Sequence, residues 1–118
     1  MPTGEHFDRA ALLDRVEGDE ELLTEMIQLY VEDAPRTLEA MRSALYKNDL
    51  PVLERAAHSL KGSSSSLTAK TVAEAALRLE QSARRRDTNG AESCLAEIER
   101  ALNELLPALA AQASRVTK

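Results

Sequence analysis

One short stretch combines residue types that could carry chemistry, namely His58, Lys61 and Gly62. On a helical wheel of about 100° per residue, the apolar residues of the stretch fall opposite His58, so its imidazole stands in the middle of the exposed face. A histidine side chain is partly neutral near pH 7, so a free ring nitrogen can act as a nucleophile. Lys61 would place an ammonium beside an anion held at His58. Gly62 costs an exposed helix about 1 kcal/mol relative to alanine, and it leaves room for a close approach.

Two plainer interpretations of this histidine are a core residue with satisfied nitrogens and a solvated surface residue without a role. The wheel excludes the first, because Leu53, Ala56 and Leu60 occupy the side opposite the imidazole. The second stays open. Ser65 also falls near His58 and could form a hydrogen bond, although small size alone is the favoured reason for its presence.

The elements that must position these residues are helices. The chain has 118 residues, of which 43% are apolar and 30% charged, with only four glycines and four prolines, as expected for one all-α domain. Amphipathic periodicity predicts helices over about 8–16, 19–47, 49–67, 70–87 and 91–113. Short connections favour antiparallel neighbours, so the sequence predicts an up-down-up-down four-helix bundle with a short N-terminal helix. Residues 1–6 and about 114–118 are expected to be a disordered leader and tail.

Two prolines and two polar stretches determine how the helices are bounded. The apolar stripe keeps its phase across Pro35, which predicts one kinked helix instead of two. Pro107 is expected to kink the last helix or to end its regular part. Thr68 is expected to serve as a turn and cap residue, and Asp87-Thr88-Asn89-Gly90 predicts the turn before the last helix.

Charge and cysteine content narrow the class of partner. The net charge of −5 argues against nucleic acid as the main partner, and the basic run 84–86 fits a helix C-terminus that complements the helix dipole. The single cysteine, Cys94, excludes an internal disulfide and is expected to be a core thiol. No segment reaches transmembrane length and no signal peptide appears, so no membrane association and a cytoplasmic location are expected.

The form His58-x-x-Lys61-Gly62, followed by small residues and Leu67, resembles the histidine-containing phosphotransfer (HPt) family, and the flanking chain fits that family at nearly full length. The resemblance implies a four-helix bundle whose exposed histidine carries a phosphoryl group between the aspartates of receiver domains. In that chemistry Lys61 would stabilise the phosphoryl oxygens and Gly62 would give clearance for the partner's acidic pocket.

The resemblance also suggests a carboxylate or amide from the next helix beside the histidine, and Glu80 stands at that position. A carboxylate that accepts from Nδ1–H would fix the tautomer and leave Nε2 as the nucleophile. The alternative for Glu80 is a solvated charge paired with Arg84 at i+4. Arg55, Ser65 and Leu77 are expected to contact the receiver, although Leu77 could equally be a residue at the bundle edge.

Three hypotheses about function follow. The leading one is a phosphorelay intermediate that exchanges a phosphoryl group with response-regulator receiver domains and a hybrid sensor histidine kinase. The alternatives are the phospho-acceptor domain of a chemotaxis-type histidine kinase and a non-catalytic helical docking module in which His58 is incidental. No glycine-rich ATP loop is present, so no kinase activity of its own is expected. No cofactor is expected, since Mg²⁺ would come with the receiver, and the chain is expected to be a monomer.

Overall fold

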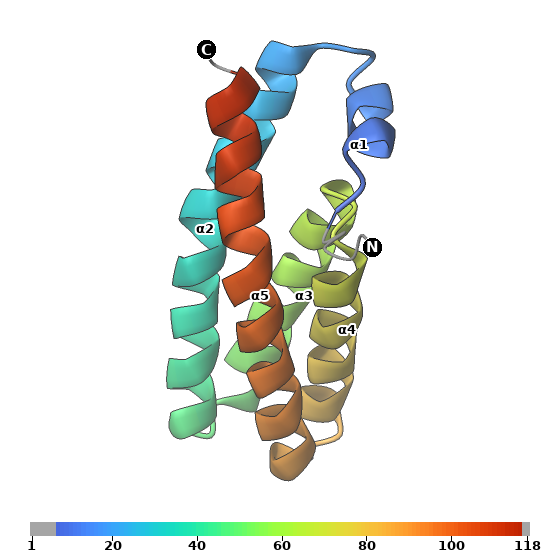
Figure 1. Ribbon diagram of the computed structural model, residues 1–118. Coiled ribbons are helices and arrows are strands. Elements are labelled where there is room, and N and C mark those ends of the chain that lie inside the picture. The colour runs from blue at the N-terminus through green and yellow to red at the C-terminus, as the bar shows by residue number, and fades with distance from the viewer. Residues whose placement is uncertain (1–6, 117–118) are drawn as a thin grey trace.

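The chain folds into a bundle of long helices. The structure, a computed structural model, describes residues 7–116, with side chains described for residues 7–113. The described residues form α1 (Arg9–Arg15), α2 (Glu20–Tyr46), α3 (Leu50–Ser66), α4 (Lys70–Arg84) and α5 (Thr88–Val116). Figure 1 shows α2 to α5 side by side, with α1 across one end above α3 and α4.

Each helix of the bundle has two neighbours. The helix α3 packs between α2 and α4, and α5 closes the bundle by packing on the same two helices. The connections at 47–49, 67–69 and 85–87 are short, so consecutive helices run antiparallel. The predicted all-α bundle with a short N-terminal helix is confirmed.

Aspartates precede four of the five helices that the described residues form, and three of these starts, at Asp8, Asp19 and Asp49, agree with the prediction. The carboxylates of Asp8 and Asp19 each accept a backbone N–H three residues on, at 3.0 Å, and Asp49 does the same at 3.4 Å. These bonds satisfy donors that a helix start leaves free, which explains why the helices begin where the sequence predicts.

The predicted turn at residues 87–90 is wrong. The helix α4 ends at Arg84, and the chain reverses at Arg86, whose φ of 62° is left-handed. Asp87 then accepts the N–H of Gly90 at 2.9 Å, so the following residues form the first turn of α5. A turn-like composition therefore marks a capped helix start, because the Asp87 carboxylate supplies the acceptor that the first turn needs.

Thr68 forms a turn, as predicted, but it does not cap α4. Its φ is 59°, and the residue that precedes the helix is Ala69, which provides no side-chain cap. The hydroxyl oxygen of Thr68 instead accepts the backbone N–H of Asp8 at 2.7 Å. The side chain is thus engaged by the start of α1 and is not available to the first turn of α4.

The short helix α1 is tied to the α3–α4 turn. The guanidinium of Arg15 donates to the carbonyls of Ser65 at 2.9 Å and Ser66 at 3.1 Å, which are among the free acceptors at the end of α3. Leu12 of α1 is fully buried in the core. This helix therefore covers one end of the bundle and fixes the end of the helix that carries His58.

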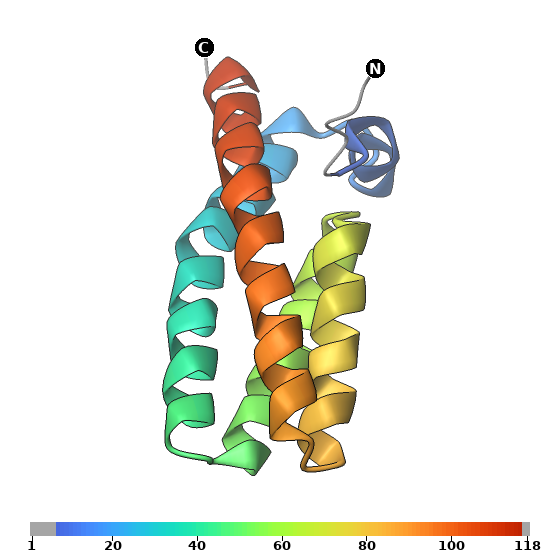
Figure 2. The same ribbon diagram turned by 60° about the horizontal axis from the view of Figure 1, so that its bottom comes forward.

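Pro35 and Pro107 lie inside continuous helices. The helix α2 runs through Pro35 and changes direction along its length, as Figure 2 shows, in agreement with one kinked helix. The helix α5 continues through Pro107 to Val116, so Pro107 does not end it. It also extends into the segment predicted to be a disordered tail. The predicted leader, residues 1–6, and residues 117–118 lie outside the described residues.

The core is built almost entirely from aliphatic side chains on the inward faces of the helices. The residues spaced along the inward face of α5 are buried: Cys94, Leu95, Ile98, Leu102, Leu105 and Leu109. Cys94 is therefore a core thiol, as expected. The packed faces leave the opposite sides of α3 and α4 free to carry polar residues.

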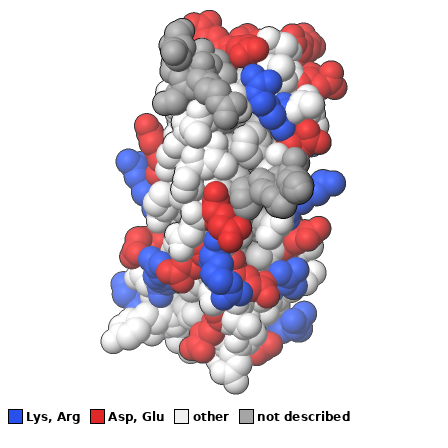
Figure 3. Space-filling model, viewed as in Figure 1, with Lys and Arg blue, Asp and Glu red and all other residues white. Residues whose placement is uncertain are grey.

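The outer surface mixes charges of both signs. On the face shown in Figure 3, Lys and Arg side chains lie next to Asp and Glu side chains and form no continuous basic area. Within residues 7–116, none of the helices combines the length and the apolar content required for a membrane span.

Candidate functional site

His58 lies halfway along α3, on the side of the bundle. Its side chain is 65% exposed, whereas Ala57 and Leu60 of the same helix are buried in the core. The sequence prediction that the imidazole faces solvent is confirmed.

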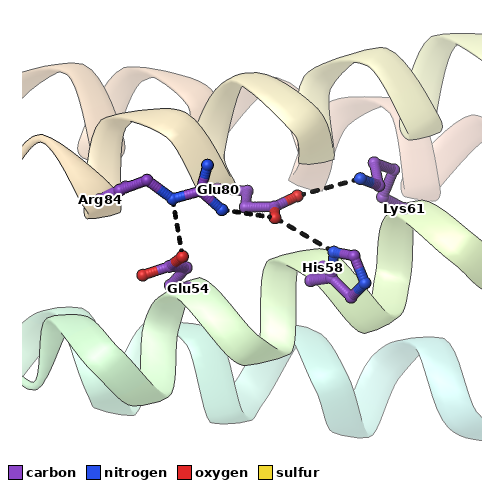
Figure 4. Close-up of polar contacts among 5 residues, drawn as sticks. All are labelled: Glu54, His58, Lys61, Glu80 and Arg84. Carbon is purple, nitrogen blue, oxygen red and sulfur yellow. Dashed lines mark hydrogen bonds and ion pairs between the residues drawn. The ribbon is translucent and has the colours of Figure 1, made fainter.

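The structure brings Glu80 of α4 to the imidazole. Its Oε2 lies 3.1 Å from Nδ1 of His58, and Figure 4 shows the other ring nitrogen directed away from the carboxylate. The Glu80 side chain is only 8% exposed, so it is not the solvated surface charge that was the alternative interpretation.

Glu80 is surrounded by cations. Nζ of Lys61 lies 3.2 Å from Oε1, and a terminal nitrogen of Arg84 donates to Oε2 at 3.1 Å. The i+4 pair with Arg84 therefore exists in addition to the contact with His58. Oε1 is buried and forms no hydrogen bond with the described residues, so Lys61 contacts it as an ion pair. The charges of Lys61 and Arg84 offset the cost of holding a buried carboxylate in the fold.

The same contacts fix the charge state of Glu80. Desolvation by burial raises the pKa of this carboxyl, but the contacts with Lys61 and His58 outweigh that effect, so the pKa lies below its ordinary value. An ionised carboxylate can only accept hydrogen bonds. The hydrogen between Glu80 and His58 therefore belongs to Nδ1, and Nε2 of the neutral ring carries a free lone pair.

Sequence reasoning missed the role of Glu54 in this cluster. Its Oε2 accepts from Nε of Arg84 at 2.9 Å, so Arg84 bridges Glu54 of α3 and Glu80 of α4 (Figure 4). Glu54 falls on the His58 side of the wheel, and Arg84 lies one turn after Glu80. That spacing on two adjacent helices was the available signal.

Gly62 stands in open space. A Cβ atom added at this position would have no heavy atom within 4 Å in the described part of the chain, apart from its own helix backbone and neighbours. Packing within the chain thus does not require glycine here. Lys61, beside it, has a side chain that is 30% exposed and is partly available from solvent.

The three predicted docking residues lie on different parts of the surface. Arg55 is exposed on α3, and Leu77, 39% exposed, lies one turn before Glu80 on α4. Ser65 is exposed two turns after His58, about 10 Å along the helix, next to Arg15 of α1. The structure therefore places Ser65 near the α1 end of the bundle and not against the imidazole.

An apolar groove that the sequence did not indicate lies on the other side of α3. It has a volume of about 270 Å³ between α2 and α3, and its lining includes Leu29, Met26 and Ser59, the residue next to His58. Leu29 is 62% exposed. The apolar stripe of α2 predicts which side of that helix faces the core. It does not predict that the outer side of the helix borders a groove.

No set of three or more His, Cys, Asp or Glu side chains that could hold a metal ion occurs within the part of the chain that the structure describes. The groups around His58 form a hydrogen-bonded charge cluster, in which Nε2 of the imidazole has no hydrogen-bond partner among the described residues.

Comparisons with known proteins point to one family. The Hpt domain family profile matches residues 25–112. The crystal structure of histidine-containing phosphotransfer protein B (HptB) from Pseudomonas aeruginosa PAO1 is similar with a TM-score of 0.88 and 27% identity, over 96% of this chain and 98% of that chain. An X-ray structure from rice, described as a histidine-containing phosphotransfer protein, has a TM-score of 0.80 and 18% identity, over 97% of this chain and 86% of that one; it supports the fold. No curated protein matches the sequence. Since the family profile covers most of the sequence, the chain belongs to the Hpt domain family.

Proposed function

We propose that this chain is a histidine phosphotransfer domain of a multistep phosphorelay and that His58 is its phosphoryl carrier. The observation that carries the proposal is that the two ring nitrogens of His58 have different surroundings. Nδ1 is 3.1 Å from the buried carboxylate of Glu80, and the side chain is otherwise exposed. This arrangement leaves one nucleophilic nitrogen, Nε2, accessible to a phosphoryl donor.

In the transfer step, Nε2 attacks the phosphorus of an aspartyl phosphate on a receiver domain. The N–P bond forms as the P–O bond to the aspartate breaks, and the aspartate leaves as a carboxylate. The ring becomes a cation with its hydrogen still on Nδ1, and Glu80 stabilises that charge through the existing hydrogen bond. The reverse sequence passes the phosphoryl group to a second receiver.

The neighbours of His58 supply charge and access. The Lys61 ammonium forms an ion pair with Glu80 and carries three donors, so it can also meet the phosphoryl oxygens. Gly62 leaves clearance for the receiver. Arg55 and Leu77 extend the surface on the α3 and α4 sides, and Ser65 would meet the partner only at its far edge. The Mg²⁺ that such transfers use is expected on the receiver.

The test is phosphoryl uptake from a phosphorylated receiver domain in the presence of Mg²⁺. Wild type should acquire an acid-labile, base-stable label, and His58→Gln should acquire none. The chain has two histidines, so His6→Gln is the matched control and should label like wild type. A folded wild type that takes no label from several receivers would contradict the relay role. Labelling by an ATP-dependent kinase domain alone would indicate the kinase-substrate role, and unlabelled but stable receiver binding would indicate a docking module.

The proposal also includes that the chain is a monomer and that it lies in the cytoplasm. Light scattering of the purified chain should give the mass of one copy, and a mass of two copies would contradict it.

A further inference from the structure

Arg84 is held between two carboxylates that come from different helices. Its Nε donates to Glu54 of α3 at 2.9 Å, and its terminal nitrogen donates to Glu80 of α4 at 3.1 Å. Figure 4 shows the guanidinium lying between the two acids, with His58 on the far side of Glu80.

One oxygen of Glu80 serves two donors. Oε2 accepts from Arg84 at 3.1 Å and from Nδ1 of His58 at 3.1 Å, whereas Oε1 faces Lys61. The place of Oε2 relative to the imidazole therefore depends on where the guanidinium sits.

The arginine needs a second anchor to stay in place. Its side chain is 61% exposed, and a long exposed side chain loses much rotamer freedom when it is held in one geometry. Glu54 supplies that anchor and lies one turn before His58 on the same helix, with its side chain 32% exposed. Glu54, which holds Arg84, and His58, whose imidazole contacts Glu80, thus lie on the same helix, α3.

We propose that Glu54 is a positioning residue for phosphoryl transfer: by holding Arg84, it keeps Oε2 of Glu80 aligned with Nδ1–H of His58. The inference rests on the proposed function of His58 as the phosphoryl carrier. Without Glu54, Arg84 leaves its place and the Glu80 carboxylate turns toward Lys61. The imidazole then returns toward the Nε2–H tautomer that free imidazole favours, which removes the nucleophilic lone pair.

The first test is the tautomer of His58, measured by ¹⁵N NMR of the neutral ring in the full chain. Glu54→Gln keeps the shape of the side chain and removes its charge, and it should lower the fraction of the Nδ1–H tautomer. Transfer at saturating receiver should slow by up to about tenfold, because the direct outer partner of a metal-bound histidine is worth about 10- to 100-fold and Glu54 acts further out, while the KM for the receiver stays unchanged. Glu97→Gln is the matched control. Glu97 of α5 is the partner of Arg78, which lies on α4 as Arg84 does, and this pair is away from His58.

A double-mutant cycle separates positioning from a general effect on folding. If Glu54 acts through Arg84, Glu54→Gln should change neither the tautomer nor the rate further in an Arg84→Gln background. An unchanged tautomer in Glu54→Gln, or an equal loss of rate in both backgrounds, would overturn the inference. Failure of wild type to accept phosphate would contradict the proposed function instead, and the tautomer comparison would still decide whether Glu54 positions the ring.

Discussion

At His58 the two ring nitrogens differ in what surrounds them, and the proposed chemistry of the residue depends on this difference. Nδ1 faces Glu80, whose carboxylate is buried and ionised, while the rest of the ring is exposed. A buried carboxylate is normally a cost to the fold. Here the ion pair with Lys61 and the hydrogen bonds from Arg84 and His58 offset that cost, so the cluster holds a proton on Nδ1 of His58.

The charge state of Glu80 predicts how stability depends on pH. In the unfolded chain this carboxyl binds its proton at the ordinary pKa of 4.5, and in the folded chain the pKa is lower. Below pH 4.5 the unfolded state therefore binds more protons, so the free energy of unfolding falls as the pH falls. Glu80→Gln removes this contribution. Urea unfolding at about pH 6 and about pH 3.5 should show a smaller acid-induced loss in the variant than in wild type.

The control for that experiment is Glu74→Gln, an exposed carboxylate on the same helix. It should lose stability with acid as much as wild type does. An equal acid-induced loss in Glu80→Gln and wild type would show that the cluster does not hold the carboxylate ionised.

Gly62 predicts opposite effects on stability and on transfer. Because an added Cβ meets open space, Gly62→Ala should raise the free energy of unfolding by up to about 1 kcal/mol through helix propensity. The same methyl group occupies the space proposed for the receiver, so the KM for transfer should rise several-fold. Ser59→Ala is the control, because Ser59 is an exposed neighbour of His58 and the substitution adds no volume. It should leave transfer unchanged. Unchanged transfer in Gly62→Ala would contradict a clearance role.

The exposed face of His58 follows from periodicity, since residues of one helix keep a fixed angular relation. The contact with Glu80 crosses two helices, so placing it required the resemblance to a family as well as the residues. The spacing of Glu54 and Arg84 places both on the His58 side of their helices, but it does not show that they touch, because the contact depends on two long side chains and on the packing of α3 against α4.

At the scale of the elements, α3 separates two unlike surfaces. Its α4 side carries the charge cluster, and its α2 side borders an apolar groove. Beneath that groove, the hydroxyl groups of Tyr30 of α2 and Ser64 of α3 form a buried hydrogen bond of 2.8 Å. This bond fixes α3 against α2 one and a half turns after His58.

Tyr30→Phe should destabilise the bundle. It leaves the buried hydroxyl of Ser64 without this partner, at a cost of about 1 to 3 kcal/mol measured by urea unfolding. Adding Ser64→Ala should recover part of the loss. Tyr46→Phe is the control, because Tyr46 is 92% exposed, and it should change stability little. A loss in Tyr30→Phe no larger than in Tyr46→Phe would show that the buried bond does not hold the helices together.

Alkaline pH gives an independent readout of the same tyrosine. Burial raises the pKa of Tyr30 to about 12 despite the hydrogen bond with Ser64, which lowers it. The unfolded chain releases this proton at the ordinary pKa of 10.0, so wild type should lose stability as the pH rises from 10.0 toward 12. That loss should be smaller in Tyr30→Phe.

The bounds of the elements were largely predictable where an aspartate precedes a periodic apolar stripe, as at Asp19 and Asp49. The same residue type misled the prediction at Asp87, because Asn89 and Gly90 after it have the composition of a turn. Only the backbone shows that the chain reverses one residue earlier, at the left-handed Arg86. The Thr68 hydroxyl likewise does not cap α4, because it accepts the backbone N–H of Asp8, which is distant in sequence. No local pattern reveals this contact.

At the scale of the whole molecule, the bundle is elongated, with extents of 44 × 28 × 20 Å. His58 lies halfway along α3, on the long side of the bundle and not in an enclosed cleft. In the proposed function the nucleophile stands on an exposed helix surface, so the partner would exclude water and supply the remaining charges. This explains why the chain needs only a small cluster around the imidazole, and why its outer surface can be polar and mixed in charge.

The most direct test of this account is to identify the phosphorylated atom. The chain, labelled with ¹⁵N in its histidines, is phosphorylated by a receiver, and ³¹P–¹⁵N coupling locates the new bond. The account predicts a phosphoryl group on Nε2 of His58, with Nδ1 still protonated. A phosphoryl group on Nδ1, or on any other residue, would contradict the assignment of Glu80 as the partner of Nδ1 and of His58 as the carrier.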